Sequence, residues 1–373
     1  MADWDPGTPL PDSFFEIAQR VYANDPDWLP EDKQSIAPLF TSGNPFFGIG
    51  EAWVSVKGNT RLVGFRDPRI SYNEEPVAYF GYWETEDDQE VNRALFADLE
   101  EWARAKGAKA VYGPVNFSTY QDYRLRLTFE NQGGPFLAEP YNPSRYNGLL
   151  EELGYSITME WESQILTPAQ VDFCCDTMRP MVQQMLKGAG IRVEAFTPEL
   201  WLNNIENFYE LINIIWADNF GYFKTDLETF KMVFGSSLAG KMCRNSSVAF
   251  FKEETNQLIG YFVTYPDYAP LMRAGNPERV PYRDVSFDTH HALLQSPVLL
   301  AKSGAVHPDY RKAGLFGALA VELTGRAREA GYAQVVAALA RSDNASTRVR
   351  NMFPEGLNEI LELRKYGLYS KAI

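Results

Sequence analysis

The most informative part of the chain is residues 299–319, which read LLAKSGAVHPDYRKAGLFGAL. An apolar strand pattern runs to Val306, and a loop marked by proline and carrying two cations, Arg311 and Lys312, follows it. Gly314 then opens an amphipathic helical pattern. The first backbone N–H groups of a helix lack intrahelical partners, the helix dipole favours negative charge there, and glycine lets a phosphate approach the main chain. The segment therefore predicts an anion-binding turn between a strand and a helix.

This segment belongs to the second of two similar patterns along the chain. After it, apolar residues recur at helical spacing to Ala327, Gly331 ends the helix, and residues 335–339 form a strand pattern. The same order of helix, glycine and strand occurs at residues 91–112. Residues 103, 104, 107 and 111 are even identical to those found 224 positions later. The chain therefore contains an internal repeat.

Each repeat is preceded by strand patterns and opens with a helical pattern. The predicted strands are residues 51–56, 61–65, 76–83, 248–252, 258–265 and 297–306, and the predicted opening helices lie around residues 13–22 and 198–217. Such an order, occurring twice, favours an α/β (α+β) protein of two domains. We place them at residues 1–165 and 166–373.

The charge of the chain divides in the same way. Its 373 residues carry a formal net charge of −14, which argues against nucleic acid as a partner because phosphate binding requires a basic surface. Residues 1–165 contain 27 acidic and 13 basic residues, whereas residues 166–373 contain 22 of each. This asymmetry indicates two units with different partners.

The cysteines and histidines form no recognisable site. Cys174, Cys175 and Cys243 have neither disulfide nor metal-ligand spacing, and the three histidines lie in no metal-binding motif, so we predict no metal. No run of about 18 apolar residues and no secretory signal pattern occurs. We therefore expect a cytoplasmic protein that does not bind membranes.

Residues 306–317 resemble the acyl-CoA-binding loop of GNAT-type N-acetyltransferases, whose pattern is [Q/R]-x-x-G-x-[G/A] between a strand and a helix. Arg311 and Gly314 match it, but Phe316 occupies the last position and Gly317 comes one residue late. The likeness covers roughly residues 195–373, and the first half resembles a degenerate second copy. The resemblance implies two GNAT-like domains, each a mixed, mostly antiparallel sheet flanked by helices, with acetyl-CoA or another acyl-CoA as co-substrate.

The resemblance also assigns roles to individual positions. It implies that the main chain of Ala305 and Val306 pairs with the pantetheine arm and that Asn344 contacts the same arm. It implies that the pyrophosphate is wrapped by Arg311, Lys312, Ala313, Gly314, Leu315, Phe316 and Gly317. The tyrosine that often serves as general acid is replaced here, and the nearest substitutes are Tyr366 and Tyr369. The corresponding place in the first half, residues 84–90, holds five acids, so we expect no CoA there.

The general base and the acceptor pocket are less clearly marked. Strand 297–306 contains no acid, and its functional side chains are Lys302 and Ser303. The base therefore comes either from the irregular segment 265–296, where His290 and His291 lie, or from the acidic first half. Residues 112–123 are rich in aromatic and hydrogen-bonding groups, which is typical of a substrate pocket and equally of a packed turn.

We therefore expect an acyl-CoA-dependent N-acyltransferase that acts on a small amine or amino-acid-like acceptor through a ternary complex, with Ser303, His290 and Tyr369 as candidate catalytic residues. Two alternatives stay open. A catalytically inactive acyl-CoA-binding or regulatory protein would keep the loop and lack the base. An aminoacyl or peptidyl transferase on a tandem GNAT fold would need a basic face for RNA.

Overall fold

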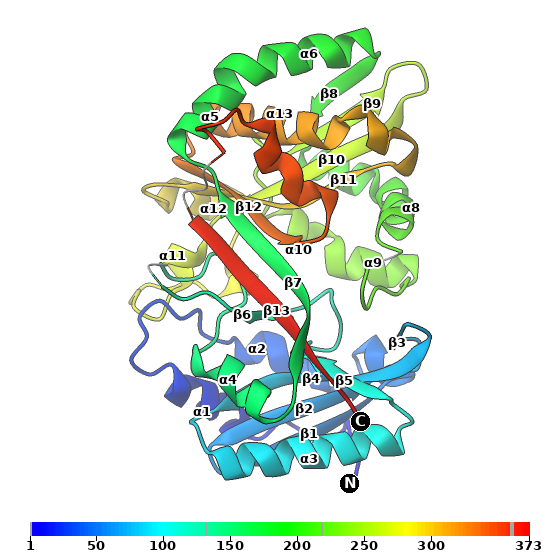
Figure 1. The fold of residues 1–373 in the computed structure, drawn as a ribbon, viewed down its shortest axis with the longest axis vertical. Helices are drawn as coiled ribbons and strands as arrows, with labels where there is room; N and C mark the ends of the chain where they lie inside the picture. The colour runs from blue at the N-terminus through cyan, green and yellow to red at the C-terminus, as the bar shows by residue number, and fades with distance from the viewer. Residues whose placement is uncertain (1, 131–132, 218, 359–361) are drawn as a thin grey trace.

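The computed structural model describes residues 2–130, 133–217, 219–358 and 362–373. The strands are β1 (Glu51–Lys57), β2 (Thr60–Arg66), β3 (Ser71–Tyr72), β4 (Glu75–Thr85), β5 (Ala110–Gly113), β6 (Leu125–Arg126), β7 (Ser156–Ile165), β8 (Ile191–Ala195), β9 (Val248–Lys252), β10 (Gln257–Pro266), β11 (Val298–Val306), β12 (Gln334–Arg341) and β13 (Glu362–Ala372). They form one sheet through the whole molecule, in the order β1-β2-β4-β5-β13-β7-β12-β11-β10-β9-β8, with the short strands β3 and β6 paired to β4 and β13 (Figure 1).

Helices cover the faces of this sheet. They are α1 (Asp12–Val21), α2 (Lys33–Ile36), α3 (Gln89–Ala105), α4 (Arg145–Glu152), α5 (Pro168–Phe173), α6 (Arg179–Gly188), α7 (Pro198–Asn203), α8 (Ile205–Ile215), α9 (Leu227–Phe234), α10 (Ser236–Ala239), α11 (Ala269–Met272), α12 (Phe287–His290) and α13 (Leu315–Glu329). In the part of the chain that the structure describes, no helix combines the length and the apolar character that crossing a membrane requires.

The two-residue period of the strands explains how each face finds its helices. In the first half, Leu62 belongs to the cluster around α3, whereas its neighbour Val63 belongs to the cluster around α1. In the second half, Phe250 packs with α13, whereas Phe251 packs with α7–α9. Each half is thus a layer of sheet between two layers of helices.

Two pairs of neighbouring strands are parallel. In the first half, β4 and β5 pair from Val77 with Ala110 to Tyr79 with Tyr112. In the second, β11 and β12 pair from Val298 with Gln334 to Ala301 with Ala337. The remaining pairs among the described strands are antiparallel. The predicted fold class, two mixed and mostly antiparallel sheets flanked by helices, is confirmed, although the sheets are joined into one.

Two long strands, β7 and β13, lie side by side and connect the halves (Figure 1). The start of β7 pairs with β13, and its end, Trp161–Ile165, pairs with both β13 and β12. The end of β13 pairs with β5, from Tyr369 with Gly113 to Ala372 with Ala110. Residues 362–372 therefore complete the sheet of the first half, although the sequence assigns them to the second.

Candidate functional site

The predicted anion-binding turn lies between β11 and α13. The short helix η6 (Pro308–Ala313) leads to Gly314, which has φ +70° and precedes the first turn of α13. A side chain rarely adopts this left-handed conformation, which explains the glycine. No side chain caps α13, so its first N–H groups stay open to a ligand. The side chain of Arg311 is exposed, whereas the side chains of Lys312 and Ala313 lie outside the described residues.

Beyond this turn, β11 and β12 separate. Their pairing ends at Ala301 and Ala337, and residues 302–306 and 338–341 line a cavity. The backbone of β11 is therefore unpaired on this side from Lys302 to Val306. A V-shaped opening of this kind offers free N–H and C=O groups to an extended ligand.

The corresponding opening of the first half is filled by the chain itself. The N–H of Val115 donates to the carbonyl of Phe80 (2.7 Å), and the N–H of Tyr82 donates to Oδ1 of Asn116 (2.8 Å). A side chain at Gly81 would place its Cβ 2.4 Å from the carbonyl oxygen of Val115. Residues 115–116 therefore leave no room for a ligand between β4 and β5.

The cavity has a volume of about 1370 Å³ and is lined by both halves. This volume exceeds the range of about 300–1,000 Å³ that is common for small-molecule sites. Much of the wall is apolar or aromatic. Its members include Trp201, Ile212, Ile215, Phe234 and Leu238 near α7–α10, and Leu166, Cys174, Leu323, Val335 and Phe353 near α13.

The charged side chains that line the cavity fall into two groups. Those with ion-pair partners are Glu31 with Arg61, Asp32 with Arg283, Glu139 with Arg364, and Arg341 with Asp343. Among the described contacts, the lining residues Glu84, Asp122, Arg124, Lys302 and Arg311 have no ion-pair partner within the bridging distance. These five are the charges available to a ligand.

Three of them, Asp122, Arg124 and Lys302, interact with one another. Burial raises the pKa of Asp122, and the positive charge of Lys302 opposes that shift. Burial lowers the pKa of Lys302 to about 8; the carboxylate of Asp122 opposes this shift, and the positive charge of Arg124 adds to it. The carboxylate of Asp122 is nevertheless open to the cavity. A proton acceptor with a raised pKa therefore faces the strand where β11 separates from β12.

Glu84 forms a separate acidic group in the first half. Its carboxylate accepts hydrogen bonds from Tyr146 (2.7 Å) and Tyr22 (3.4 Å). Burial raises its pKa to about 7, and the nearby positive charge of Arg61 opposes the shift. Glu84 is thus partly protonated at neutral pH.

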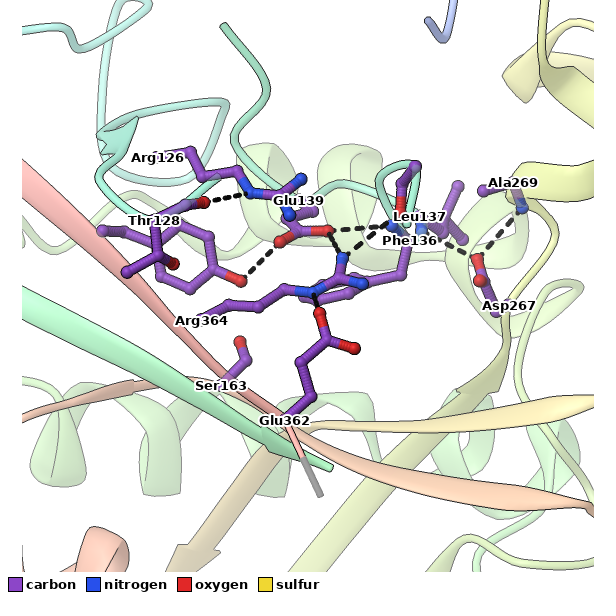
Figure 2. Close-up of polar contacts among 12 residues, drawn as sticks. Arg126, Thr128, Phe136, Leu137, Glu139, Ser163, Asp267, Ala269, Glu362 and Arg364 are labelled. Atoms are coloured by element: carbon purple, nitrogen blue, oxygen red, sulfur yellow. Dashed lines mark hydrogen bonds and ion pairs between the residues drawn. The ribbon is translucent and has the colours of Figure 1, made fainter. Parts of the chain in front are cut away.

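One wall of the cavity, residues 137–141, is fixed by buried polar contacts (Figure 2). Arg364 and Tyr366 of β13 donate to Glu139 (2.5 and 2.6 Å). Asp267, which follows β10, accepts from the N–H groups of Leu137 and Ala269 (2.8 and 3.0 Å). The carbonyl of Ala138, between these anchors, accepts from Lys302 (3.4 Å). Strands from both halves therefore hold the wall and position Lys302.

The structure brings some of the predicted site residues together and separates others. Ser303, Ala305, Val306, Arg311, Phe316 and Asn344 line the cavity, whereas Gly314, Leu315 and Gly317 lie in the turn and helix beside it.

His290 and Tyr369, two of the predicted catalytic residues, do not line the cavity. Nδ1 of His290 accepts from the N–H of Ser286 (3.1 Å), and the hydroxyl of Tyr369 donates to Oδ1 of Asn147 (3.1 Å). Both side chains are buried in local packing. Their catalytic roles stay predictions, and neither side chain is among the residues that line the cavity.

Sequence reasoning missed Asp122 and Arg124. Asp122 lies inside the segment 112–123 that the composition marked as a possible pocket, and Arg124 follows it immediately. The sequence feature that could have indicated them is a pair of opposite charges, Asp122 and Arg124, two residues apart in a segment rich in aromatic residues. Nothing local to that segment indicated that Lys302 would lie opposite them.

Two known proteins are similar to this chain in sequence. No family model matches the chain. The chain is 25% identical over 266 residues to a bacterial ceramide synthase of Caulobacter vibrioides (strain NA1000 / CB15N), a match over 68% of this chain and 66% of that protein. It is 24% identical over 226 residues to protein YghO of Escherichia coli (strain K12), over 56% of this chain and 54% of that protein. The matches thus span between about half and two thirds of the length of these relatives.

Solved structures resemble the whole chain. A tandem GNAT protein from the clavulanic acid biosynthesis pathway superposes with a TM-score of 0.50 and 12% identity, over 98% of this chain and 97% of that one. The glucosamine N-acetyltransferase region of a fungal multi-domain β-N-acetylglucosaminidase superposes with a TM-score of 0.52 and 10% identity, over 99% of this chain and 38% of that one. These likenesses establish a tandem GNAT fold, which confirms the resemblance seen in residues 306–317.

Proposed function

We propose that this tandem GNAT-fold protein is an N-acyltransferase that moves an acyl group from a CoA thioester to an amine, and that at least one of the two substrates carries a long apolar chain. The observation that carries the proposal is the continuity of one cavity. It joins the turn before α13, the opening between β11 and β12, and the free carboxylate of Asp122.

The residues on the donor side fit a CoA thioester. The open N–H groups at the start of α13 and the unpaired Arg311 suit the pyrophosphate. The unpaired backbone of β11 from Lys302 to Val306 suits the pantetheine arm. A CoA thioester bound in this way would have its carbonyl near the point where the strands separate.

Asp122 is the proposed general base. The acceptor enters as an ammonium, gives one proton to Asp122, and its nitrogen attacks the thioester carbonyl carbon. The C–N bond forms, the C–S bond breaks, and the departing thiolate of CoA takes up a proton. A carboxylate with a raised pKa suits this exchange near neutral pH because it accepts a proton more readily than an ordinary aspartate.

Direct transfer is favoured over a covalent acyl-enzyme. Cys174 is the cysteine that lines the cavity, but burial, together with neighbouring Cys175, raises the pKa of its thiol to about 12. The thiolate is the nucleophilic form of cysteine. At neutral pH this side chain is therefore a thiol and a poor nucleophile.

The size and apolar wall of the cavity support a long chain. A ceramide is the amide of a long-chain amino alcohol and a fatty acid, so a relative described as a ceramide synthase makes the same kind of bond between two long-chain groups. The volume of about 1370 Å³ is more than acetyl and a small amine require.

The test is release of free CoA, followed with a thiol reagent, across acyl-CoAs of increasing length and a panel of long-chain amines and amino acids. Asp122→Asn should lower kcat/KM by about 100-fold or more, since it removes the base. Asp288→Asn changes an aspartate that pairs with Arg244 and lies outside the cavity lining, so its rate should match the wild type. Absence of amine-dependent CoA release, or full activity of Asp122→Asn, would overturn the proposal.

A further inference from the structure

We propose that Arg124 and Lys302 form a binding site for an anionic group, a carboxylate or a phosphate, that the acceptor carries near its amine. The inference rests on the proposed function and makes the acceptor zwitterionic.

Arg124 is a buried cation that interacts with the hydroxyl of Tyr123 but has no ion-pair partner among the described residues. Its side chain is only 9% exposed, and Nε and Nη1 have no hydrogen-bond partner among the described residues. Two other buried arginines have carboxylate partners: Arg61 donates to Glu31 (2.8 Å), and Arg364 donates to Glu139 (2.5 Å). Arg124 is also one of the residues that line the cavity.

Two aromatic rings hold the guanidinium in place without neutralising it. Its Cζ lies 3.7 Å from the ring centre of Tyr123 and 4.6 Å from that of Trp161. The backbone of Arg124 has φ +84°, an uncommon conformation for a residue with a side chain. Strained residues persist where the surroundings impose them, and they cluster at ligand sites. The rings and the backbone thus orient a planar fork of N–H donors, which matches the geometry of a carboxylate or a phosphate.

The charges of the cluster favour an anion beside the two cations. Arg124 and Lys302 contribute two positive charges, and Asp122 contributes one negative charge. Glu31, which also interacts with Asp122, is already paired with Arg61. The cluster is therefore left with an excess of one positive charge in a buried place, where an unpaired charge is costly. An ammonium beside Asp122 and an anion beside Arg124 and Lys302 would give each of these side chains a group of opposite charge to contact.

The phosphates of CoA have their own place and do not explain this cluster. Arg311 lies on η6, beyond the end of β11 at Val306, whereas Lys302 lies four residues before Val306, about 13 Å back along the strand at the usual rise per residue. The two cationic positions therefore serve different parts of the bound substrates.

The test compares ligands that differ only in the anion. Binding of undecylamine, 2-aminododecanoic acid and 2-aminododecyl phosphate is measured by titration calorimetry without an acyl donor. We expect the wild type to bind at least one of the two anionic amines about tenfold or more tightly than undecylamine, as charge-assisted hydrogen bonds allow. The preferred anion identifies the acceptor as a carboxylate or a phosphate. Equal binding of all three would overturn the inference.

Variants separate a binding role from a structural one. Arg124→Gln and Lys302→Met should each remove most of the preference for the anionic amine without weakening the binding of undecylamine, since each variant removes a positive charge near Asp122. Arg124→Lys should restore part of the preference. Arg69→Gln is the matched control, because Arg69 also stacks on a ring, that of Phe223, but pairs with Asp67 and does not line the cavity. A preference that survives in Arg124→Gln would overturn the inference.

Stability provides a second readout. Arg124→Met removes an unpartnered buried charge, so the ligand-free variant should melt at a higher temperature than the wild type. A lower Tm would show a structural role for Arg124 and contradict the inference. Because these measurements need no turnover, anion-dependent binding without CoA release would overturn the proposed acyl transfer and leave the anion site standing.

Discussion

Glu84 makes the stability of the folded protein depend on pH. Its pKa is about 7 in the folded protein and 4.5 as the ordinary value. Between these values the folded chain holds a proton that the unfolded chain has released, so stability falls as pH rises from about 4.5 to about 7 and is level above that. The full loss corresponds to about 3 kcal/mol.

We expect Glu84→Gln to remove this part of the decline. Urea unfolding of the variant at pH 5, 6, 7 and 8 should show a shallower fall than that of the wild type. Glu90→Gln, which alters an exposed acid of the same acidic run, should follow the wild type. Parallel curves for Glu84→Gln and the wild type would contradict the raised pKa. Asp267, whose burial raises its pKa to about 6, contributes in the same direction, so the difference between curves is the informative quantity.

A substitution of Arg311 tests whether CoA binds at the turn before α13. Arg311→Glu places a negative charge beside the start of α13 and should weaken CoA binding in calorimetry by about tenfold or more. The side chain is exposed, so Tm should not change. Lys57→Glu makes the same change of charge at an exposed residue of β1 outside the cavity lining and should leave CoA affinity as it is. Equal affinities in both variants would mean that CoA does not bind at this turn.

The donor-side residues were predictable because their signal is local. A strand, Arg311, Gly314 and a helix follow one another in the chain, and the chemistry of a helix start depends on neighbours in sequence. Asp122 lies in the segment between β5 and β6, whereas Lys302 lies on β11. They interact only because the fold brings the two halves together, and no periodicity in the sequence indicates that contact. His290 attracted attention for its chemistry alone, and the structure places it away from the cavity.

At the scale of elements, a substitution can test how residues 115–116 close the space between β4 and β5. Gly81→Ala would force its Cβ against the carbonyl of Val115, a backbone atom that cannot move aside easily. We expect a loss of about 1–3 kcal/mol in the free energy of unfolding, measured by urea titration. Gly148→Ala in α4 meets no atom within 4 Å and should instead raise stability, by about 0.5–1 kcal/mol. A neutral Gly81→Ala would contradict the tight closure of this opening.

Elements were predicted well where periodicity or turn signals marked them. Strands β1, β2, β9 and β10 begin and end within about two residues of the expected positions. Their pairing was harder to predict, because β13 joins β5 and β7 through contacts between residues far apart in sequence. From the sequence, β13 is expected in the second domain, because its residues fall between 166 and 373, but it pairs with β5 of the first half.

At the scale of the molecule, the shared strands predict that the first half depends on the second. Residues 1–165 expressed alone lack β13, so β5 and β7 have unpaired edges, and we expect no cooperative thermal transition by circular dichroism. Co-expression with residues 166–373 should restore a folded complex. A cooperative transition of residues 1–165 alone, at a Tm close to that of the intact chain, would contradict this dependence.

The position of β13 also imposes an order on biosynthesis. β5 leaves the ribosome long before β13 is translated, so the nascent first half exposes the edge that β13 will later cover. Exposed edges invite pairing with other chains. The interval ends when β13 emerges, and until then the edge of β5 can pair with other chains. Translation speed through the second half thereby sets how long the first half waits.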